Sequence, residues 1–313
     1  MKKYRIGLLH HGGENEIWGS VVTTFYLKKA FERLGHEVYR ISVTEHQDYP
    51  KLLAKKTDFI VCEGVPEWQI PKGVWDTTDI KIFWWLSDLF YDINTIKRTN
   101  FNAIAVNSNA FQELRESNII SDRIDLAVDK DFDRATAKKK YKSDFVYVGN
   151  YPHKSKKQMD FMFLNAEKVG KLNLWGHGWD LSPYFANYKE PLHYTELASL
   201  YKSVKYSLLL TEKRQMKREM FNNRVFEVLG SGCLALCEKY DALEKSDLGK
   251  YIKFVKTQED FVNALKNYNK PENQLLIKEA QDYVLKNHNY DERAKQFIAL
   301  FEKGKGKKDE NFS

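Results

Sequence analysis

Two glutamates, Glu219 and Glu227, frame the segment of this chain whose residue types are best suited to chemistry. Asn223 between them is predicted to be a helix N-cap, so the amides of the first helical turn and the positive end of the helix dipole would face a bound anion. Arg224 precedes Glu227 by three residues, which on a helix places a guanidinium and a carboxylate on one face. Together these groups suit the binding of a sugar nucleotide.

The elements around this segment position it at the end of a strand. Gly230 and Gly232 would end the helix, and the apolar run at 233–237 is typical of a buried parallel strand. A strand-like run at 206–210 comes before the helix. The pattern therefore predicts a strand, a helix and a further strand, with the two glutamates beside the carboxyl end of the first.

This segment resembles the E-x7-E motif of retaining GT-B glycosyltransferases, in which two glutamates are separated by seven residues. Within that superfamily (glycosyl transferases group 1), the chain is most similar to the CgeB-like enzymes. Four segments in the family's order carry the resemblance, at 144–149, 174–179, 223–227 and 288–293. The first half of the chain resembles the family only in outline. The resemblance implies two facing Rossmann-like domains with parallel sheets, and transfer of a sugar from a nucleoside diphosphate sugar to an acceptor hydroxyl with retained configuration.

The resemblance also implies roles for individual residues. Glu227 would accept hydrogen bonds from the ribose hydroxyls, and Arg224 would support the phosphates or orient Glu227. The catalytic residues implied are Glu219, which would contact the transferred sugar, Asp88, which would orient the acceptor hydroxyl, and His11. The residues expected to bind the donor are Gly12, Gly13, Gly149, Asn150, Lys154, His177, Arg214, Asn223, Arg224, Val225 and Glu227.

Several of these assignments have competitors in the sequence. Two basic clusters could neutralise the donor diphosphate, namely Lys154, Lys156 and Lys157 in one and Lys213, Arg214 and Arg218 in the other. Trp175 and Trp179 would either shape the base pocket around His177 or pack in the core. Asp88 could equally cap a helix, and around Glu219 this chain has charge and bulk where most E-x7-E enzymes have small residues.

The first domain would contribute a glycine loop, residues 10–15, after its opening strand. Its glycines let backbone amides approach a diphosphate or a sugar hydroxyl. The loop lacks the G-x-G-x-x-G pattern, which argues against a dinucleotide-dependent enzyme. A D-x-D pattern at Asp129-Lys130-Asp131 is interpreted as solvated charge, so no metal and no cofactor other than the donor substrate are expected.

Composition agrees with two α/β domains. The chain has 313 residues with 42% hydrophobic content, and its net charge of +7 favours phosphorylated or polyanionic ligands. Its three cysteines lie in apolar runs, which indicates reduced thiols and a cytoplasmic protein. No run is long enough for a membrane span or a signal peptide.

Alternating strand and helix patterns place the first domain at 1–135 and the second at 143–288, with a polar linker at 129–142. A helix at 289–303 would pack back on the first domain, before a disordered tail at 304–313. The strands are expected at 4–9, 38–41, 59–62, 81–85, 103–106, 145–148, 172–175, 206–210 and 233–237. The helices are expected at 20–35, 110–116, 156–169, 194–202, 223–230, 272–287 and 290–302.

Rival functions remain at this stage. The acceptor would be a surface glycan, a protein or a small molecule, whereas the alternative is a hydroxymethylated base in DNA, as some phage enzymes use. A two-domain binding protein without catalysis would share the cleft, and a nucleic-acid-binding protein would share the basic charge. The sugar, the base and the oligomeric state are not determined by the sequence.

Overall fold

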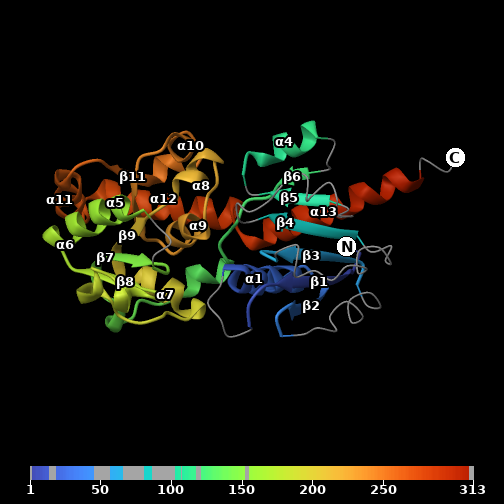
Figure 1. Cartoon of the computed structure of the whole chain (residues 1–313), viewed down its shortest axis with the longest axis horizontal. Helices are drawn as coiled ribbons and strands as arrows, with labels where there is room; N and C mark the ends of the chain where they lie inside the picture. Colours follow the sequence, from blue (N-terminus) through green and yellow to red (C-terminus); the bar gives the residue numbers. More distant parts are fainter. Residues whose placement is uncertain are drawn as a thin grey trace. The chain divides into compact units, whose positions relative to one another are not determined.

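The computed structural model describes residues 2–13, 19–45, 57–65, 81–86, 103–106, 108–117, 121–151 and 155–309. The chain forms two compact units, which are Met1–Leu126 with Tyr290–Ser313 (unit 1) and Ala127–Asn289 (unit 2). Figure 1 shows a parallel sheet with its helices in each. The predicted α/β class with two parallel-sheet domains is therefore confirmed.

The predicted linker at 129–142 lies inside unit 2, and the division of the chain falls before it. Interactions within unit 2 account for this difference. The amide of Val128 donates to the carbonyl of His288 at 3.0 Å. Tyr141 is buried against Trp175, with ring centroids 5.2 Å apart. The segment is polar in sequence because its apolar residues are few, yet those few are packed in the core.

Unit 1 contains a six-stranded parallel sheet in the order β2-β1-β3-β4-β5-β6. Its strands are β1 (Arg5–His10), β2 (Glu37–Ser42), β3 (Phe59–Glu63), β4 (Lys81–Leu86), β5 (Ala103–Val106) and β6 (Ser121–Arg123). Apolar side chains occupy both faces of β3 and β4, as a sheet covered on both sides requires.

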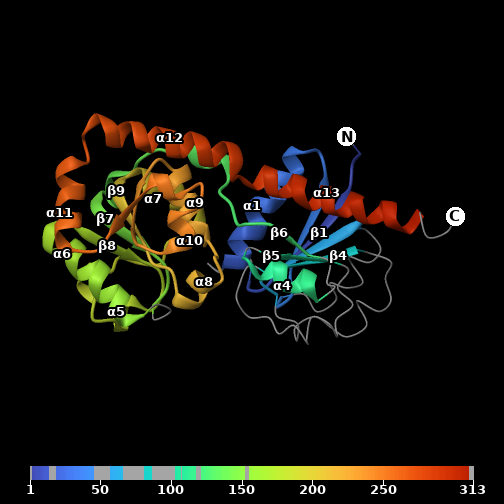
Figure 2. The same ribbon diagram turned by 90° about the horizontal axis from the view of Figure 1, so that it is seen from above.

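Helices α1 (Gly19–Arg33) and α13 (Tyr290–Asp309) cover one face of this sheet, and α4 (Ala110–Glu116) covers the other (Figure 2). Phe297 of α13 packs on Trp85 with ring centroids 5.2 Å apart. The helix ends at Asp309, beyond the residue at which the sequence predicts its end.

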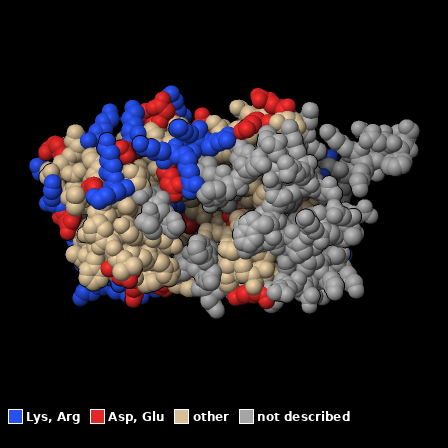
Figure 3. Space-filling view, viewed as in Figure 1, with Lys and Arg blue, Asp and Glu red and all other residues tan. Residues whose placement is uncertain are grey.

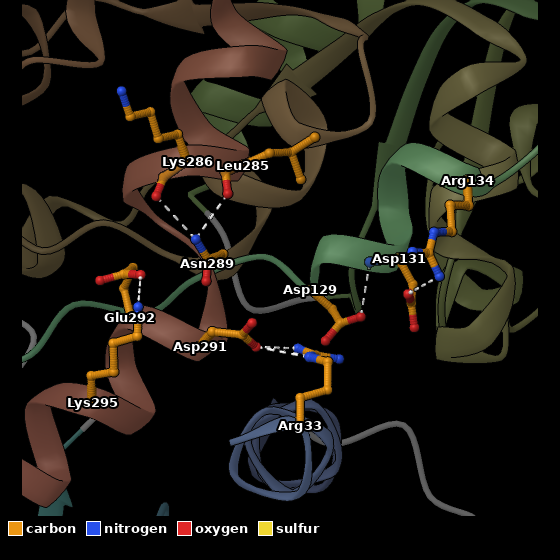
Figure 4. Close-up of polar contacts among 10 residues, drawn as sticks. All are labelled: Arg33, Asp129, Asp131, Arg134, Leu285, Lys286, Asn289, Asp291, Glu292 and Lys295. Carbon is orange, nitrogen blue, oxygen red and sulfur yellow. Dashed lines mark hydrogen bonds and ion pairs between the residues drawn. The ribbon is translucent and has the colours of Figure 1, made fainter. Parts of the chain in front are cut away.

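Two arginines anchor α13 within unit 1. Arg33 of α1 donates from Nε to the Asp291 carboxylate at 2.9 Å (Figure 4). Arg293 donates from Nε to the carbonyl of Asp125 at 2.7 Å and from Nη2 to that of Leu126 at 3.1 Å. The last helix is therefore fixed both to the first helix and to the segment that ends the first half of the unit.

Unit 2 contains a five-stranded parallel sheet in the order β11-β10-β9-β7-β8. Its strands are β7 (Ser143–Val148), β8 (Leu172–Trp175), β9 (Val204–Leu209), β10 (Leu234–Glu238) and β11 (Ile252–Val255). Its α-helices are α5 (Lys156–Met159), α6 (Asn165–Val169), α7 (Leu197–Lys202), α8 (Lys213–Lys217), α9 (Asn223–Gly230), α10 (Asp241–Glu244), α11 (Gln258–Asn267) and α12 (Pro271–Asn287). A π-helical turn, Asp160–Leu164, joins α5 to α6.

The core of unit 2 is rich in aromatic residues. Phe145, Phe163 and Trp179 have no exposed surface and lie in one apolar cluster between the sheet and the α5–α6 and α11 helices. Helices α7, α9 and α12 pack against one another and complete the unit. Sequence analysis missed β6, β11, α8, α10 and α11. These elements are short or polar, so they have little apolar periodicity to reveal them.

In the part of the chain that the structure describes, no helix is both long and apolar enough to cross a bilayer. Cys62, Cys233 and Cys237 are buried free thiols, and burial raises the pKa of each. This matches the reduced cysteines expected from the sequence.

Candidate functional site

The loops after β7 and β8 are joined at the carboxyl end of the unit 2 sheet. The amide of Gly149 donates to the Trp175 carbonyl, and the amide of Tyr151 donates to the His177 carbonyl, both at 2.9 Å. The amide of His177 donates to Asn150 Oδ1, also at 2.9 Å. Two predicted donor-binding residues, Asn150 and His177, are thus brought together, with the His177 side chain exposed to solvent.

Glycines make this close approach possible. A Cβ atom at Gly176 would lie 2.3 Å from the carbonyl oxygen of Gly149, and its φ of +134° also disfavours other residues. A Cβ atom at Gly149 would lie 2.3 Å from Arg224 Nη1. The loop after β7 therefore touches both the loop after β8 and the first turn of α9.

The N-cap of helix α9 lies one residue before the predicted N-cap, Asn223. Asn223 is the first helical residue, and Asn222 is the N-cap, with extended φ and ψ of −80° and 162°. Asn222 makes no side-chain capping bond, and within the described residues its buried amide nitrogen and oxygen have no hydrogen-bond partner. The predicted capping role of Asn223 is therefore wrong, although both asparagines lie at this helix start.

Arg224 ties α9 to β7. Its Nη1 donates to Tyr147 Oη at 3.1 Å and to the carbonyl of Val148, and the guanidinium carbon lies 5.2 Å from the centroid of the Tyr147 ring. Among the described residues, Nη1 is the only guanidinium nitrogen with a hydrogen-bond partner. The Nε and Nη2 donors therefore remain for a ligand oxygen.

Glu227 is almost completely buried, with 5% of its surface exposed. Burial raises the pKa of its carboxyl group to about 7, and the positive charge of Arg224 opposes this rise. Tyr201 of α7 is close enough for its own pKa to rise, through burial and then through the charge of Glu227. In the described part of the chain, neither the Glu227 carboxylate nor Tyr201 Oη has a hydrogen-bond partner. Unsatisfied polar groups of this kind are rare in protein interiors and mark a site that a ligand or water completes.

Glu219 occupies a strained turn between α8 and α9. Its φ is +53°, the left-handed region that favours glycine, and it is the only such non-glycine residue in the described ranges. The Glu219 amide donates to the Met216 carbonyl at 3.1 Å, and the Met220 amide donates to the Gln215 carbonyl at 3.0 Å. These bonds form a Schellman motif with glutamate at the position where glycine is usual. The side chain is exposed.

The predicted basic residues differ in their surroundings. Arg214 is exposed and pairs with Glu212 at 2.6 Å, and Lys156 is exposed and pairs with Asp160, also at 2.6 Å. Lys157, Lys213 and Arg218 lie at exposed or half-buried positions, and Lys154 lies outside the described residues. Val225, by contrast, is fully buried and packs in the interior of unit 2.

Trp175 and Trp179 belong to the core. Trp179 has no exposed surface and donates from Nε1 to the Gly149 carbonyl at 2.6 Å, whereas Trp175 is 4% exposed. The two buried rings support the loops after β7 and β8. The side chain of His177, between the two tryptophans in sequence, is exposed.

In unit 1 the predicted loop after β1 is held by two serines. Ser42 Oγ donates to the Gly12 carbonyl at 2.8 Å, and Ser20 Oγ donates to the His11 carbonyl at 2.7 Å. His11 and Gly13 are half-buried. Asp88 lies outside the described residues.

Sequence reasoning missed two buried ionisable residues in unit 1. His10 and Glu63 are in register on the neighbouring parallel strands β1 and β3, with 0% and 2% of their surfaces exposed. The available signal was the position of each at the carboxyl end of an apolar strand. Tyr147 and Tyr201 of unit 2 were also missed, because tyrosines in apolar runs are ordinarily core residues.

The D-x-D pattern proves to be structural. Asp129 is fully buried and accepts a hydrogen bond from the Asp131 amide at 3.0 Å, which caps the short helix that follows (Figure 4). The interpretation of Asp129 as solvated charge is therefore wrong. No group of three or more His, Cys, Asp or Glu side chains among the described residues is placed to hold a metal ion.

A cavity of about 270 Å³ lies elsewhere in unit 2, beside the edge strand β11 and helix α11. Its lining includes Tyr206, Lys253 and Asn263, and none of the residues predicted to bind the donor. The grouping at the ends of β7, β8 and α9 is the better candidate, because it combines buried ionisable groups with unused hydrogen-bonding capacity.

A family model matches part of the second half of this chain. Residues 156–299 match a family model described as glycosyl transferase-like, and this range includes α8, α9 and both motif glutamates. The two parallel-sheet α/β units have the fold of GT-B glycosyltransferases. A search of curated protein sequences finds no match.

Solved structures similar to this chain cover almost all of its length. One is an alpha-glucosyltransferase in complex with UDP-glucose and DNA containing an abasic site, at 13% identity and a TM-score of 0.72, covering 96% of this chain and 100% of that one. Another is a glycosyltransferase from Rickettsia africae ESF-5, at 11% identity and 0.68, covering 97% and 99%. A third is AviGT4, a glycosyltransferase involved in avilamycin A biosynthesis, at 14% identity and 0.62, covering 96% and 97%. At these identities the likeness shows the shared fold.

Proposed function

We propose that this chain is a glycosyltransferase that moves a sugar from a nucleoside diphosphate sugar to an acceptor hydroxyl, with retention of configuration, as the resemblance to CgeB-like E-x7-E enzymes implies. Five of the similar structures contain UDP or UDP-glucose, which makes uridine the first base to test. The cytoplasmic location and the absence of a metal requirement stay predictions.

The observation that carries this proposal is the presence of Arg224 and Glu227, three residues apart, at the start of α9. Arg224 has two unused donor nitrogens beside the loop after β7, where they suit the oxygens of a diphosphate. Glu227 has no described hydrogen-bond partner, and its carboxylate suits the two ribose hydroxyls. The diphosphate and the ribose of the donor would thus form hydrogen bonds with Arg224 and Glu227, whose hydrogen-bonding groups are otherwise unused.

In the reaction, the acceptor oxygen forms a bond to the anomeric carbon as the bond from that carbon to the diphosphate oxygen breaks. The acceptor proton passes to the departing diphosphate, so the products are the glycoside and the nucleoside diphosphate. Glu219 would contact the transferred sugar. Its strained turn holds it between α8 and the start of α9, and such strain is characteristic of functional positions.

The test is a thermal-shift panel of nucleoside diphosphates and nucleotide sugars, with a coupled assay for diphosphate release. A ligand at a hundred times its dissociation constant stabilises the folded state by about 2.7 kcal/mol. We expect one base to be selected, and Glu227→Ala to abolish that selection in a folded protein. Glu259→Ala, which changes an exposed glutamate of α11, is the control. Unchanged nucleotide affinity in folded Glu227→Ala would refute the assignment, and no response to any nucleotide would favour the binding-protein or nucleic-acid alternatives.

A second candidate concerns the acceptor, for which a surface glycan, a protein and a small molecule compete with DNA. Three further alpha-glucosyltransferase structures similar to this chain contain DNA, two of them with an HMU base and one with an A:G mismatch. Exposed basic side chains on α8 and on either side of α10 favour a polyanionic acceptor for this chain as well. We therefore propose a modified base in DNA as the second candidate.

A further inference from the structure

Basic side chains gather on one face of unit 2, over helices α8 and α10 (Figure 3). The α8–α10 basic surface consists of Lys213, Arg214, Lys217, Arg218, Lys239 and Lys245. All are exposed except Arg218, which is half-buried. Figures 1 and 2 both show α8 beside α10, so the cations of α8 lie near the two lysines that flank α10, Lys239 and Lys245.

This surface is only partly neutralised by carboxylates. Lys245 pairs with Asp241 at 3.0 Å, and Lys239 pairs with Glu244 at 2.6 Å. Lys213 and Lys217, in contrast, have no carboxylate within ion-pair distance in the described ranges. Surface ion pairs of the first kind contribute little and are exchanged readily for phosphate contacts.

The charges on α8 oppose the stability of the helix itself. Lys213 and Lys217 are four residues apart, as are Arg214 and Arg218, and like charges at this spacing repel. Glu212 at the N-cap supplies a negative charge at this end of the helix and pairs with Arg214 at 2.6 Å, so the repulsion between Lys213 and Lys217 is the part that it does not offset. A phosphate-rich ligand would relieve this repulsion, so the arrangement of charges favours the binding of phosphate groups.

The basic surface adjoins the candidate site within the same unit. Helix α8 leads through the Schellman turn at Glu219 directly into α9. The pKa of Lys245 is raised, first by its hydrogen bond to Asp241 and also by the charge of Glu219, so α10 lies near the same turn. An acceptor held by the surface would therefore lie beside the residue proposed to contact the transferred sugar.

We propose that the α8–α10 basic surface binds the phosphates of a duplex DNA acceptor. This inference rests on the proposed glycosyl transfer and names its acceptor. Duplex DNA presents about one negative charge per 1.7 Å of helix axis, so a surface of this kind meets several phosphates at once. The binding is sequence-independent, because phosphate contacts position a duplex and do not read its bases.

The test is fluorescence anisotropy of a labelled DNA duplex with the full chain between 50 and 200 mM salt. Lys217→Gln/Lys245→Gln removes two cations of the surface. We expect the slope of log affinity against log salt to become shallower by about 1.8, since each phosphate contact contributes about 0.9. Lys266→Gln/Lys270→Gln removes two exposed cations of equal charge from the α11–α12 region and is the matched control, which should leave the slope unchanged.

Stabilisation by UDP is measured on the same proteins and separates the two hypotheses. If UDP binds but both double variants have the wild-type slope, the DNA-binding surface is refuted while the donor site stands. If UDP and its sugars fail to bind the wild-type chain, the proposed function itself fails. Tighter binding of a phosphodiester glycan such as poly(glycerol phosphate) than of DNA, through the same two lysines, would overturn DNA as the acceptor.

Discussion

The carboxyl edges of the two parallel sheets differ in how their polar groups are used. In unit 1, Ser42 and Ser20 donate to carbonyl groups of the loop after β1, so described side chains there hold the loop in place. In unit 2, Arg224 holds the end of β7 with one nitrogen and keeps two others unused. Glu227 beside it is buried with a raised pKa.

This difference indicates which edge has hydrogen-bonding groups that a ligand can use. A loop whose polar atoms are satisfied within the protein is stable without a ligand, whereas buried groups without partners cost free energy until a ligand completes them. We therefore expect changes at the unit 2 edge to affect both stability and nucleotide binding. Loss of a serine hydroxyl that holds the loop at the unit 1 edge should affect stability alone.

The largest expected effect comes from Glu227→Gln. The folded-state pKa of Glu227, about 7, exceeds its ordinary value of 4.5, so ionisation opposes folding. The stabilisation from the protonated carboxyl group is fully present below about pH 4.5 and is lost as pH rises through 7. The unfolding free energy of the amide variant should therefore exceed that of wild type by about 3 kcal/mol more at pH 8 than at pH 4.5. Urea unfolding at the two pH values measures this, and a pH-independent difference would contradict the buried carboxyl group.

Gly149→Ala should have the next largest effect. The added methyl group would lie 2.3 Å from Arg224 Nη1 and 2.8 Å from Tyr147 Oη, so the contact between α9 and β7 must open. We expect a loss of about 2 kcal/mol in unfolding free energy together with weaker nucleotide binding. Gly19→Ala, where no atom lies within 4 Å of the added carbon, is the control in unit 1. Equal nucleotide affinity in both variants would contradict the claim that the unit 2 edge binds the nucleotide.

Glu219→Gly should separate stability from activity. Glycine adopts the left-handed conformation without the penalty that glutamate pays, so the variant should be more stable by about 1 kcal/mol. Glycosyl transfer should nevertheless be lost while nucleotide binding persists. Glu219→Gln retains the strained backbone and should show no gain in stability. Full turnover by Glu219→Gly would exclude contact between this carboxylate and the transferred sugar.

The smallest functional effect is expected for Ser42→Ala in unit 1. The variant loses the hydrogen bond from Ser42 Oγ to the Gly12 carbonyl and should be destabilised by about 1 kcal/mol. Nucleotide affinity should match wild type, as measured by isothermal titration. A loss of affinity comparable to that of Gly149→Ala would show that the unit 1 loop binds the donor too.

Most of the strands were predictable, because buried parallel strands are apolar runs that local periodicity reveals. The strand at Phe59–Glu63, for example, is predicted from its apolar residues, although the prediction ends at Cys62 and omits Glu63. The edge strand β11 and helix α11 were missed because partial exposure leaves them polar. The roles of individual site residues are less determined by sequence, since they depend on which side chains meet.

The sequence by itself determined the order of most of the strands and helices, the spacing of the two glutamates and the glycines of the loops. These features are local and follow from hydrophobic periodicity and backbone preferences. Only the tertiary structure decided that Glu227 is buried beside Arg224 while Glu219 is exposed in a strained turn. Burial and pKa depend on neighbours such as Tyr147 and Tyr201, which are distant in sequence and meet α9 only when the sheet and its helices are packed.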